Sequence, residues 1–174
     1  MKLSDAIDLI KDGVEMKGDP QVWADLGAGS GLFSKALANL LPGNSIIYPI
    51  DISDVVQEIS VPDSRVQIRP LQMDMTTSKL DTPLNGVLMA NSLHFIKDKR
   101  AIIERWARTL KSAGRIIIVE YDLTQNPWIP FPVSFNHLQN LMNDLGFKQF
   151  LKLAEKPSLY NHSMIYSVLV SRLK

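Results

Sequence analysis

The apolar positions of this chain follow two periods, one typical of helices and one typical of buried strands. Apolar residues recur every three or four positions in four segments, which predicts helices over 3–15, 30–41, 97–111 and 134–145. Short apolar runs predict strands at 21–25, 45–50, 65–69, 86–90, 115–119, 147–154 and 164–170. A shorter helix is expected near 53–60, and a proline- and aromatic-rich loop occupies 123–133.

The order of these segments predicts an α/β fold. Strands alternate with helices over most of the chain, which is typical of a parallel sheet covered on both faces. The last two strands follow one another without a helix, so they must pair as an antiparallel hairpin. We therefore expect a Rossmann-like three-layer sandwich with a mostly parallel seven-stranded sheet and an antiparallel C-terminal hairpin. The 174 residues predict a single domain over 1–174, with an N-terminal helix within 1–18.

The composition adds only a few restrictions. The chain is 45% hydrophobic and 21% charged, with a net charge of +1, so it favours neither a nucleic-acid nor a membrane partner. The lack of cysteine excludes disulfides, thiolate metal sites and a cysteine nucleophile, and no metal is expected. Acidic residues interrupt the apolar residues at the N-terminus, and no apolar run approaches the roughly 18 residues of a membrane span. A cytoplasmic location is therefore expected.

A glycine-rich turn between the first strand and the second helix is the first chemical signal. Gly27-Ala-Gly-Ser-Gly31 allows positive φ angles and lets a ligand approach the backbone closely, although a tight strand-to-helix connection would use the same glycines. The third glycine comes one residue too early for a dinucleotide fingerprint, and no Walker lysine follows. Asp25 would repel a pyrophosphate but would suit a ligand that carries an ammonium group.

Asp25-Leu-Gly-Ala-Gly-Ser-Gly31 resembles motif I of the class I S-adenosylmethionine-dependent methyltransferases, (Asp/Glu)-x-Gly-x-Gly-x-Gly. The resemblance extends from about residue 21 to the end of the chain and includes the closing hairpin. It implies that S-adenosylmethionine is the cofactor and S-adenosylhomocysteine the product. The cofactor-binding residues that it implies in and before the turn are Asp25, Gly27, Ala28, Gly29 and Gly31.

The resemblance also implies cofactor contacts at the ends of later strands, where open α/β sheets bind ligands. Asp51 would accept hydrogen bonds from the ribose hydroxyls while Ile52 contacts the adenine, although Asp51 would also serve as a helix N-cap. Asp74 would accept from the adenine amino group while Met75 packs on the ring; a plain surface turn is the competing interpretation. Asn91 would help to hold the methionine end.

Methyl transfer is an in-line displacement that needs alignment and exclusion of water, and a base only when the acceptor starts protonated. His94 is the candidate base, with a packing role as the alternative. The segment 91–94 lacks the (Asp/Asn/Ser)-Pro-Pro-(Tyr/Phe) motif, which disfavours a nucleic-acid base or glutamine amide as acceptor. Trp128 and Phe131 of the loop 123–133 would either form a substrate wall or cover the core.

The leading hypothesis is a methyltransferase of class EC 2.1.1 that acts on a small molecule. A non-catalytic S-adenosylmethionine-binding or regulatory module of the same fold is the alternative. A third hypothesis is another enzyme on this scaffold, such as an aminopropyltransferase or an NAD-dependent oxidoreductase.

Overall fold

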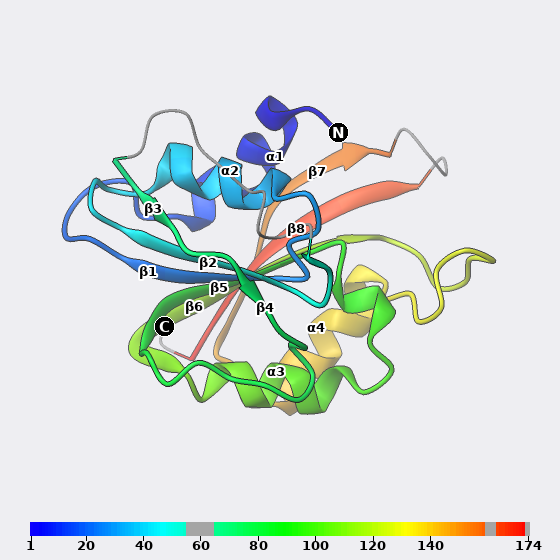
Figure 1. The fold of residues 1–174 in the computed structure, drawn as a ribbon. Helices are drawn as coiled ribbons and strands as arrows, with labels where there is room; N and C mark the ends of the chain where they lie inside the picture. Colours follow the sequence, from blue (N-terminus) through cyan, green and yellow to red (C-terminus); the bar gives the residue numbers. More distant parts are fainter. Residues whose placement is uncertain (55–64, 159–162, 173–174) are drawn as a thin grey trace.

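Eight strands form one mixed sheet in the computed structural model, which describes residues 1–54, 65–158 and 163–172 (Figure 1). The order across the sheet is β3-β2-β1-β5-β6-β8-β7, and β4 also pairs with β2. The strands are β1 (Val22–Leu26), β2 (Ile46–Asp51), β3 (Gln67–Ile68), β4 (Leu71–Gln72), β5 (Leu84–Ala90), β6 (Leu110–Tyr121), β7 (Gln149–Pro157) and β8 (Met164–Ser171). Strands β1 to β6 pair in parallel, whereas β8 runs antiparallel to both β6 and β7. The predicted mostly parallel sheet with an antiparallel C-terminal hairpin is confirmed.

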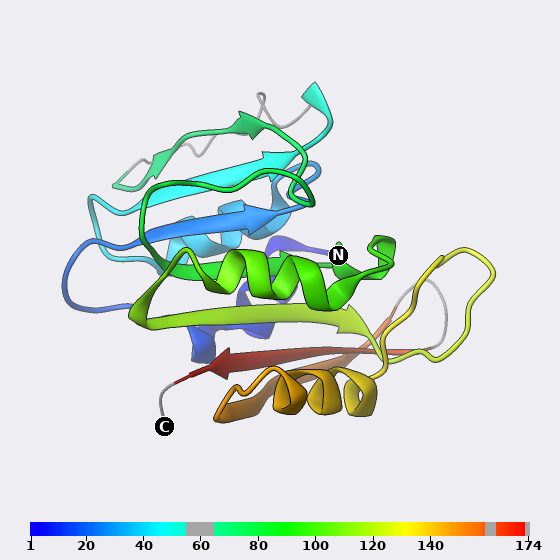
Figure 2. The same ribbon diagram turned by 90° about the horizontal axis from the view of Figure 1, so that it is seen from below.

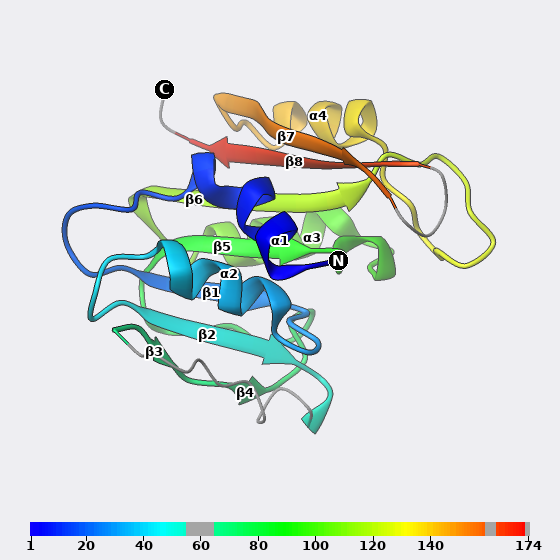
Figure 3. The same ribbon diagram turned by 90° about the horizontal axis from the view of Figure 1, so that it is seen from above.

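Helices cover both faces of the sheet and complete three layers. The α-helices of the described residues are α1 (Leu3–Ile10), α2 (Leu32–Leu40), α3 (Lys99–Ala107) and α4 (Phe135–Asp144), with 3-10 turns η1 (Lys11–Gly13) and η3 (Leu93–Phe95). Figure 2 shows α3 and α4 on one face, and Figure 3 shows α1 and α2 on the other. None of these helices is long and apolar enough to span a bilayer.

The central strands are apolar on both sides because both faces are covered. In β6, Ile116 and Ile118 belong to the core under α3 and α4, whereas Ile117 and Val119 belong to the core under α1 and α2. All four side chains are fully buried. This double burial explains the near-continuous apolar run in the sequence.

The strand predicted at 65–69 is replaced by two short strands, β3 and β4, that pair in turn with β2. Pro70 lies between them and has no backbone N–H to donate, so it interrupts the ladder. Most of the helix expected at 53–60 lies outside the described residues.

The helix predicted over 97–111 ends at Ala107, and the following strand begins much earlier than expected. Leu110, which falls within the predicted helix, instead belongs to β6 and pairs with Leu84 of β5. The pairing then shifts register between Leu84 and Gly86, so that residues 111–114 form an irregularity within β6.

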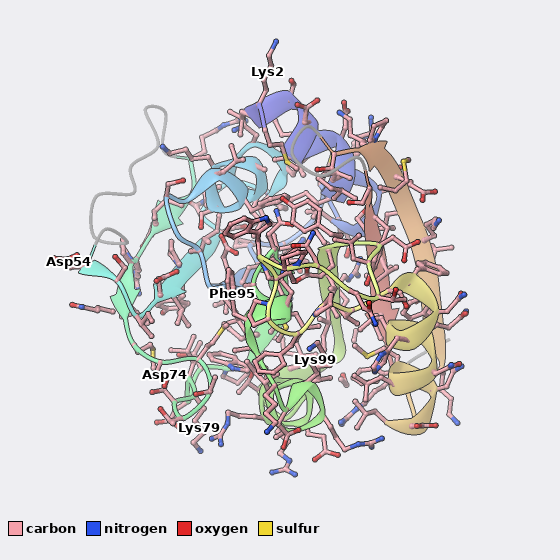
Figure 4. All side chains as sticks on the ribbon, turned by 90° about the vertical axis from the view of Figure 1, so that its right-hand side faces the viewer. Lys2, Asp54, Asp74, Lys79, Phe95 and Lys99 are labelled. Atoms are coloured by element: carbon pink, nitrogen blue, oxygen red, sulfur yellow. The ribbon has the colours of Figure 1, made fainter. Side chains whose placement is uncertain are left out.

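The C-terminal hairpin is longer than predicted. Its first strand, predicted to end at residue 154, continues to Pro157, which pairs with Met164. This extension carries Lys156 to the sheet edge where the parallel strands end. Figure 4 looks onto that edge, which the N-terminus also approaches in Figure 3.

Candidate functional site

The turn between β1 and α2 has the backbone geometry that its glycines allow. Gly27, Gly29 and Gly31 all adopt positive φ angles, of 71°, 50° and 77°. The amides of Gly27 and Ala28 both donate to the Ile50 carbonyl of β2, at 2.8 and 3.0 Å. A Cβ at Gly27 would lie 2.5 Å from the Ser92 Cβ, whereas one at Gly29 would meet no atom within 4 Å. The turn therefore packs tightly at its start and is open at its middle.

Asp25 lies on β1 just before the turn and is 1% exposed. Its carboxylate accepts a hydrogen bond of 2.6 Å from the Ser34 hydroxyl of α2. Burial raises the pKa of Asp25 from 3.8 to about 6, although the Ser34 hydrogen bonds oppose this shift. The carboxylate thus links the first strand to the helix that follows the turn. Asp25 does not line the cavity described below.

The pKa of Asp25 predicts a particular dependence of stability on pH. Between about pH 4 and pH 6 the folded chain keeps this proton while the unfolded chain loses it, so stability falls as the pH rises. The total change is on the order of 2–3 kcal/mol for a shift of this size. In urea titrations, the free energy of unfolding of Asp25→Asn minus that of the native chain should rise between pH 4 and pH 6 and then level off. A difference that stays constant over this range would contradict the assignment.

Asp51 ends β2 and joins the glycine turn to the next segment. One carboxylate oxygen accepts from the Gly29 amide at 2.8 Å, and the other accepts from the Ser53 amide at 2.9 Å. The second bond is of the capping kind that the sequence left as an alternative. The first bond nevertheless brings the carboxylate to the open part of the turn. Ile52, which follows, is 72% exposed.

Asp74 and Met75 form a turn after β4. One oxygen of Asp74 accepts from the amide and the hydroxyl of Thr76, at 2.7 and 2.6 Å, and these bonds lower the pKa of Asp74. The Met75 carbonyl accepts from the Trp106 indole of α3 at 2.9 Å, which fixes the turn to the helix layer. The turn is therefore held in place from inside the fold and is more than a free surface loop.

Asn91 and Ser92 follow β5 and carry unused hydrogen-bonding atoms. Asn91 has a φ of 52°, and its backbone N–H donates to the Val119 carbonyl of β6 at 2.8 Å. The buried Oδ1 of Asn91 and Oγ of Ser92 have no hydrogen-bond partner among the described residues. Buried polar atoms normally have partners, so these two atoms mark a place where a ligand would supply them.

These elements surround one cavity of about 530 Å³ at the carboxyl edge of the sheet. Its lining consists of Gly27, Gly29, Asp51, Ile52, Met73, Asp74, Met75, Thr76, Asn91, Ser92, Phe95 and Ile96. Figure 4 shows Phe95 and Asp74 on this side of the molecule. The size is typical of cofactor sites. An open glycine turn, exposed apolar side chains and two unpartnered polar atoms fit a nucleoside with a polar tail.

His94 lies beside the cavity in a buried cluster of charged groups. Its ring Nδ1 is 2.6 Å from a carboxylate oxygen of Glu120, and its backbone amide donates to the other oxygen at 3.2 Å. His94 is 5% exposed and Glu120 is fully buried. Lys99 donates to the carbonyls of Ile96 and Phe131, and burial lowers the pKa of Lys99. No three acidic or histidine side chains of the described residues gather as a metal site would require.

The loop 123–133 extends away from the sheet (Figure 1). Trp128 is 89% exposed, so the alternative in which it covers the core is wrong. Phe131 is more enclosed, with the Lys99 ammonium 5.7 Å from its ring centroid and its amide bonded to the His94 carbonyl. Only the base of the loop is therefore tied to the charged cluster.

Two residues of the site lacked a signal in the sequence. Ser34 holds Asp25, and Phe95 stands 60% exposed in the cavity wall. Phe95 lies one residue beyond the predicted base, so its place after β5 was the available clue. The pairing of Glu120 with His94 spans 26 residues and depends on the sheet order.

A model of a known family matches residues 24–118 of this chain, which is more than half of its length. That family is described as a methyltransferase domain. Comparison with curated proteins finds no match.

The fold is similar to those of several solved structures, two of which are named as methyltransferases. Magnesium protoporphyrin IX methyltransferase (ChlM) from Synechocystis PCC 6803, crystallised with bound S-adenosylmethionine, matches with a TM-score of 0.65 and 18% identity over 97% of this chain and 77% of its own. The glycopeptide N-methyltransferase MtfA matches with a TM-score of 0.70 and 14% identity, over 98% of this chain and 90% of its own. The YcgJ protein from Bacillus subtilis matches with a TM-score of 0.72 and 14% identity, over 98% of this chain and all of its own. The chain thus belongs to the methyltransferase domain family of the class I, S-adenosylmethionine-dependent type.

Proposed function

We propose that this chain is an enzyme that transfers a methyl group from S-adenosylmethionine to a small-molecule acceptor. The observation that carries the proposal is the pair of buried, unpartnered atoms, Asn91 Oδ1 and Ser92 Oγ, in the wall of the cavity beside the glycine turn. Leaving such atoms unpaired costs roughly 1–3 kcal/mol each, which a bound polar group would offset.

In this proposal the cavity residues divide between the three parts of the cofactor. Gly27, Ala28, Gly29 and Gly31 bring the backbone close to the ligand, and Asp25 favours the ammonium of the methionine end. Asn91 and Ser92 would hydrogen-bond that same end. Asp51 would accept from the ribose hydroxyls, and Ile52, Asp74 and Met75 would surround the adenine. The cavity lining contains all of these residues except Asp25, Ala28 and Gly31.

When bound, S-adenosylmethionine supplies an electrophilic methyl carbon; the acceptor's lone pair forms the new bond as the carbon–sulfur bond breaks, leaving S-adenosylhomocysteine and releasing any acceptor proton. We propose His94 as the base that takes such a proton. Its ring lies 4.3 Å from that of Phe95 in the cofactor cavity and 5.9 Å from that of Tyr121, centroid to centroid. Glu120 holds Nδ1, so the other ring nitrogen would act as the base, as in catalytic triads.

A small-molecule acceptor agrees with the charge of the chain and with its structural neighbours. A net charge of +1 gives little attraction to nucleic acid. Two of the neighbours are named as methyltransferases of magnesium protoporphyrin IX and of a glycopeptide. Detection of methyl transfer from radiolabelled S-adenosylmethionine to any member of a panel of small acceptors would decide against a non-catalytic module.

Asp51→Ala tests the cofactor site directly. The substitution removes a charged acceptor for the ribose and releases the Gly29 amide. Because a hydrogen bond to a charged group is worth about 1.5–3 kcal/mol, affinity for S-adenosylhomocysteine should fall at least about tenfold. Isothermal titration calorimetry measures the change.

The matched control is Asp54→Ala, three residues further along, whose exposed side chain is not part of the cavity lining. It should bind S-adenosylhomocysteine like the native chain. Equal weakening by both substitutions would argue against the ribose assignment, and lack of binding by the native chain would overturn the proposed function.

A further inference from the structure

A second cavity, of about 440 Å³, lies at the same edge of the sheet. The register of β6, β8 and β7 sets three of its residues side by side, because Tyr121 pairs with Ile165 and Ile165 pairs with Lys156. Asp5 of α1 lines it from above the strands. Asn91 also lines it, and the remaining lining residues are the apolar Met1 and Pro157.

The two cavities share one residue. Asn91 lines both the cofactor cavity and this second cavity, and it is held between them by its bond to Val119 and its positive φ. A ligand in the second cavity would therefore lie next to the end of the cofactor cavity where Asn91 and Ser92 leave polar atoms unpaired. The acceptor of a methyl transfer needs this position, because the reacting atoms must come within about 3–3.5 Å of each other.

The charged groups of the second cavity are not equally available to a ligand. Both carboxylate oxygens of Asp5 are occupied, one by the Lys156 ammonium and the other by the Lys2 backbone amide. An ammonium has three donors, and among the described residues Lys156 gives one of them to Asp5. Lys156 is 32% exposed, so its remaining donors are accessible from the cavity. The cavity can thus bind an anionic oxygen more readily than a cation.

We infer that this second cavity holds the methyl acceptor, and that the acceptor is a small, mainly apolar molecule with a carboxylate that Lys156 binds. The inference rests on the proposed function, since it places the acceptor beside the bound cofactor. The carboxylate fixes one end of the molecule, and the apolar walls exclude water around the rest of it.

Three matched probes test the inference on the chain loaded with S-adenosylhomocysteine. Hydroxynaphthoate carries a carboxylate, hydroxynaphthamide is its neutral counterpart, and aminomethylnaphthol carries a cation on the same ring system. Because a charge-assisted hydrogen bond is worth about 1.5–3 kcal/mol, the acid should bind at least about tenfold more tightly than the amide. The amine should bind most weakly. Calorimetry gives the three dissociation constants.

Lys156→Met should abolish the preference for the acid while keeping an apolar side chain of similar length. The matched control is Lys152→Met, on the same strand, where the ammonium pairs with Glu155 and lies 4.6 Å from the Phe135 ring centroid of α4, on the opposite face. Asp5→Asn keeps Lys156 but removes its charged partner, so it should retain the preference. This variant shows whether losing the ion pair itself disturbs the cavity.

The outcomes separate the two proposals. Equal binding of acid and amide, preference for the amine, no binding of any probe at millimolar concentration, or a preference that survives Lys156→Met would each overturn the acceptor assignment. In all of these cases S-adenosylhomocysteine binding would remain intact. Loss of S-adenosylhomocysteine binding in the native chain would instead overturn the proposed function.

Discussion

Replacing Gly29 by valine is expected to abolish binding of S-adenosylmethionine while the chain remains folded. Gly29 lines the cofactor cavity, and a Cβ built on it meets no atom within 4 Å. The valine side chain would therefore enter the space that the cofactor needs instead of colliding with the protein. The backbone amide of residue 29 also donates to Asp51, so the added side chain lies next to the carboxylate that we propose binds the ribose.

The substitution also strains the backbone, because Gly29 has a φ of 50°. A side chain in the left-handed region costs roughly 1–2 kcal/mol, which is less than the roughly 5–15 kcal/mol stability of a typical domain. We expect no heat of binding with S-adenosylmethionine at concentrations that saturate the native chain. Circular dichroism should show unchanged helix content.

Gly146→Val is the control that separates the effect of backbone strain on stability from the effect of a filled cavity on cofactor binding. Gly146 has a φ of 77° after α4, and a Cβ there also meets nothing within 4 Å, but it does not line the cofactor cavity. It should lose a comparable amount of stability and keep normal affinity. If Gly29→Val binds the cofactor as well as Gly146→Val does, the cavity is not the cofactor site.

The sequence was most informative where one local physical rule acts alone. The run Arg115–Val119 is the most strand-like segment of the sequence, and it lies within β6. The last two predicted strands have no helix between them, which required an antiparallel hairpin. Boundaries were less predictable where two rules compete. Leu110 has the spacing of a helix face, yet pairing with Leu84 draws it into β6. Pro157 is a typical turn residue, yet it closes a strand pair with Met164.

For the site, the sequence could predict residues that stand next to a strand end. Asp51, Asp74 and Asn91 each follow a predicted strand, and the parallel sheet brings them to one cavity. Pairings across the sheet could not be predicted in the same way. Glu120 meets His94 because β5 lies beside β6, and Lys156 meets Asp5 across 151 residues because α1 packs on the hairpin. Such contacts depend on the strand order, which no local pattern specifies.

The second large effect is expected from His94→Phe, which should lower the free energy of unfolding by about 3 kcal/mol or more. Phenylalanine fills a similar space but leaves the Glu120 carboxylate, which is fully buried, without its ring N–H partner. Leaving a buried carboxylate without its hydrogen-bond partner typically costs about 3 kcal/mol or more. Urea denaturation of the native chain and the variant measures the loss. His137→Phe, on the exposed side of α4, is the matched control and should change stability by less than about 0.5 kcal/mol.

The double variant His94→Phe with Glu120→Met distinguishes the cost of leaving Glu120 unpartnered from the cost of losing the packing of the imidazole ring. Because both polar groups are removed together, the Glu120 carboxylate is no longer left in the core without its ring partner, and much of the stability should return. A double variant that is less stable than the sum of the two single losses would contradict this account of the pair. The milder Glu120→Gln keeps an acceptor for the His94 ring but removes the negative charge. If Glu120 positions His94 as the base, this variant should lower kcat for a protonated acceptor and leave S-adenosylhomocysteine affinity unchanged, because neither residue lines the cofactor cavity.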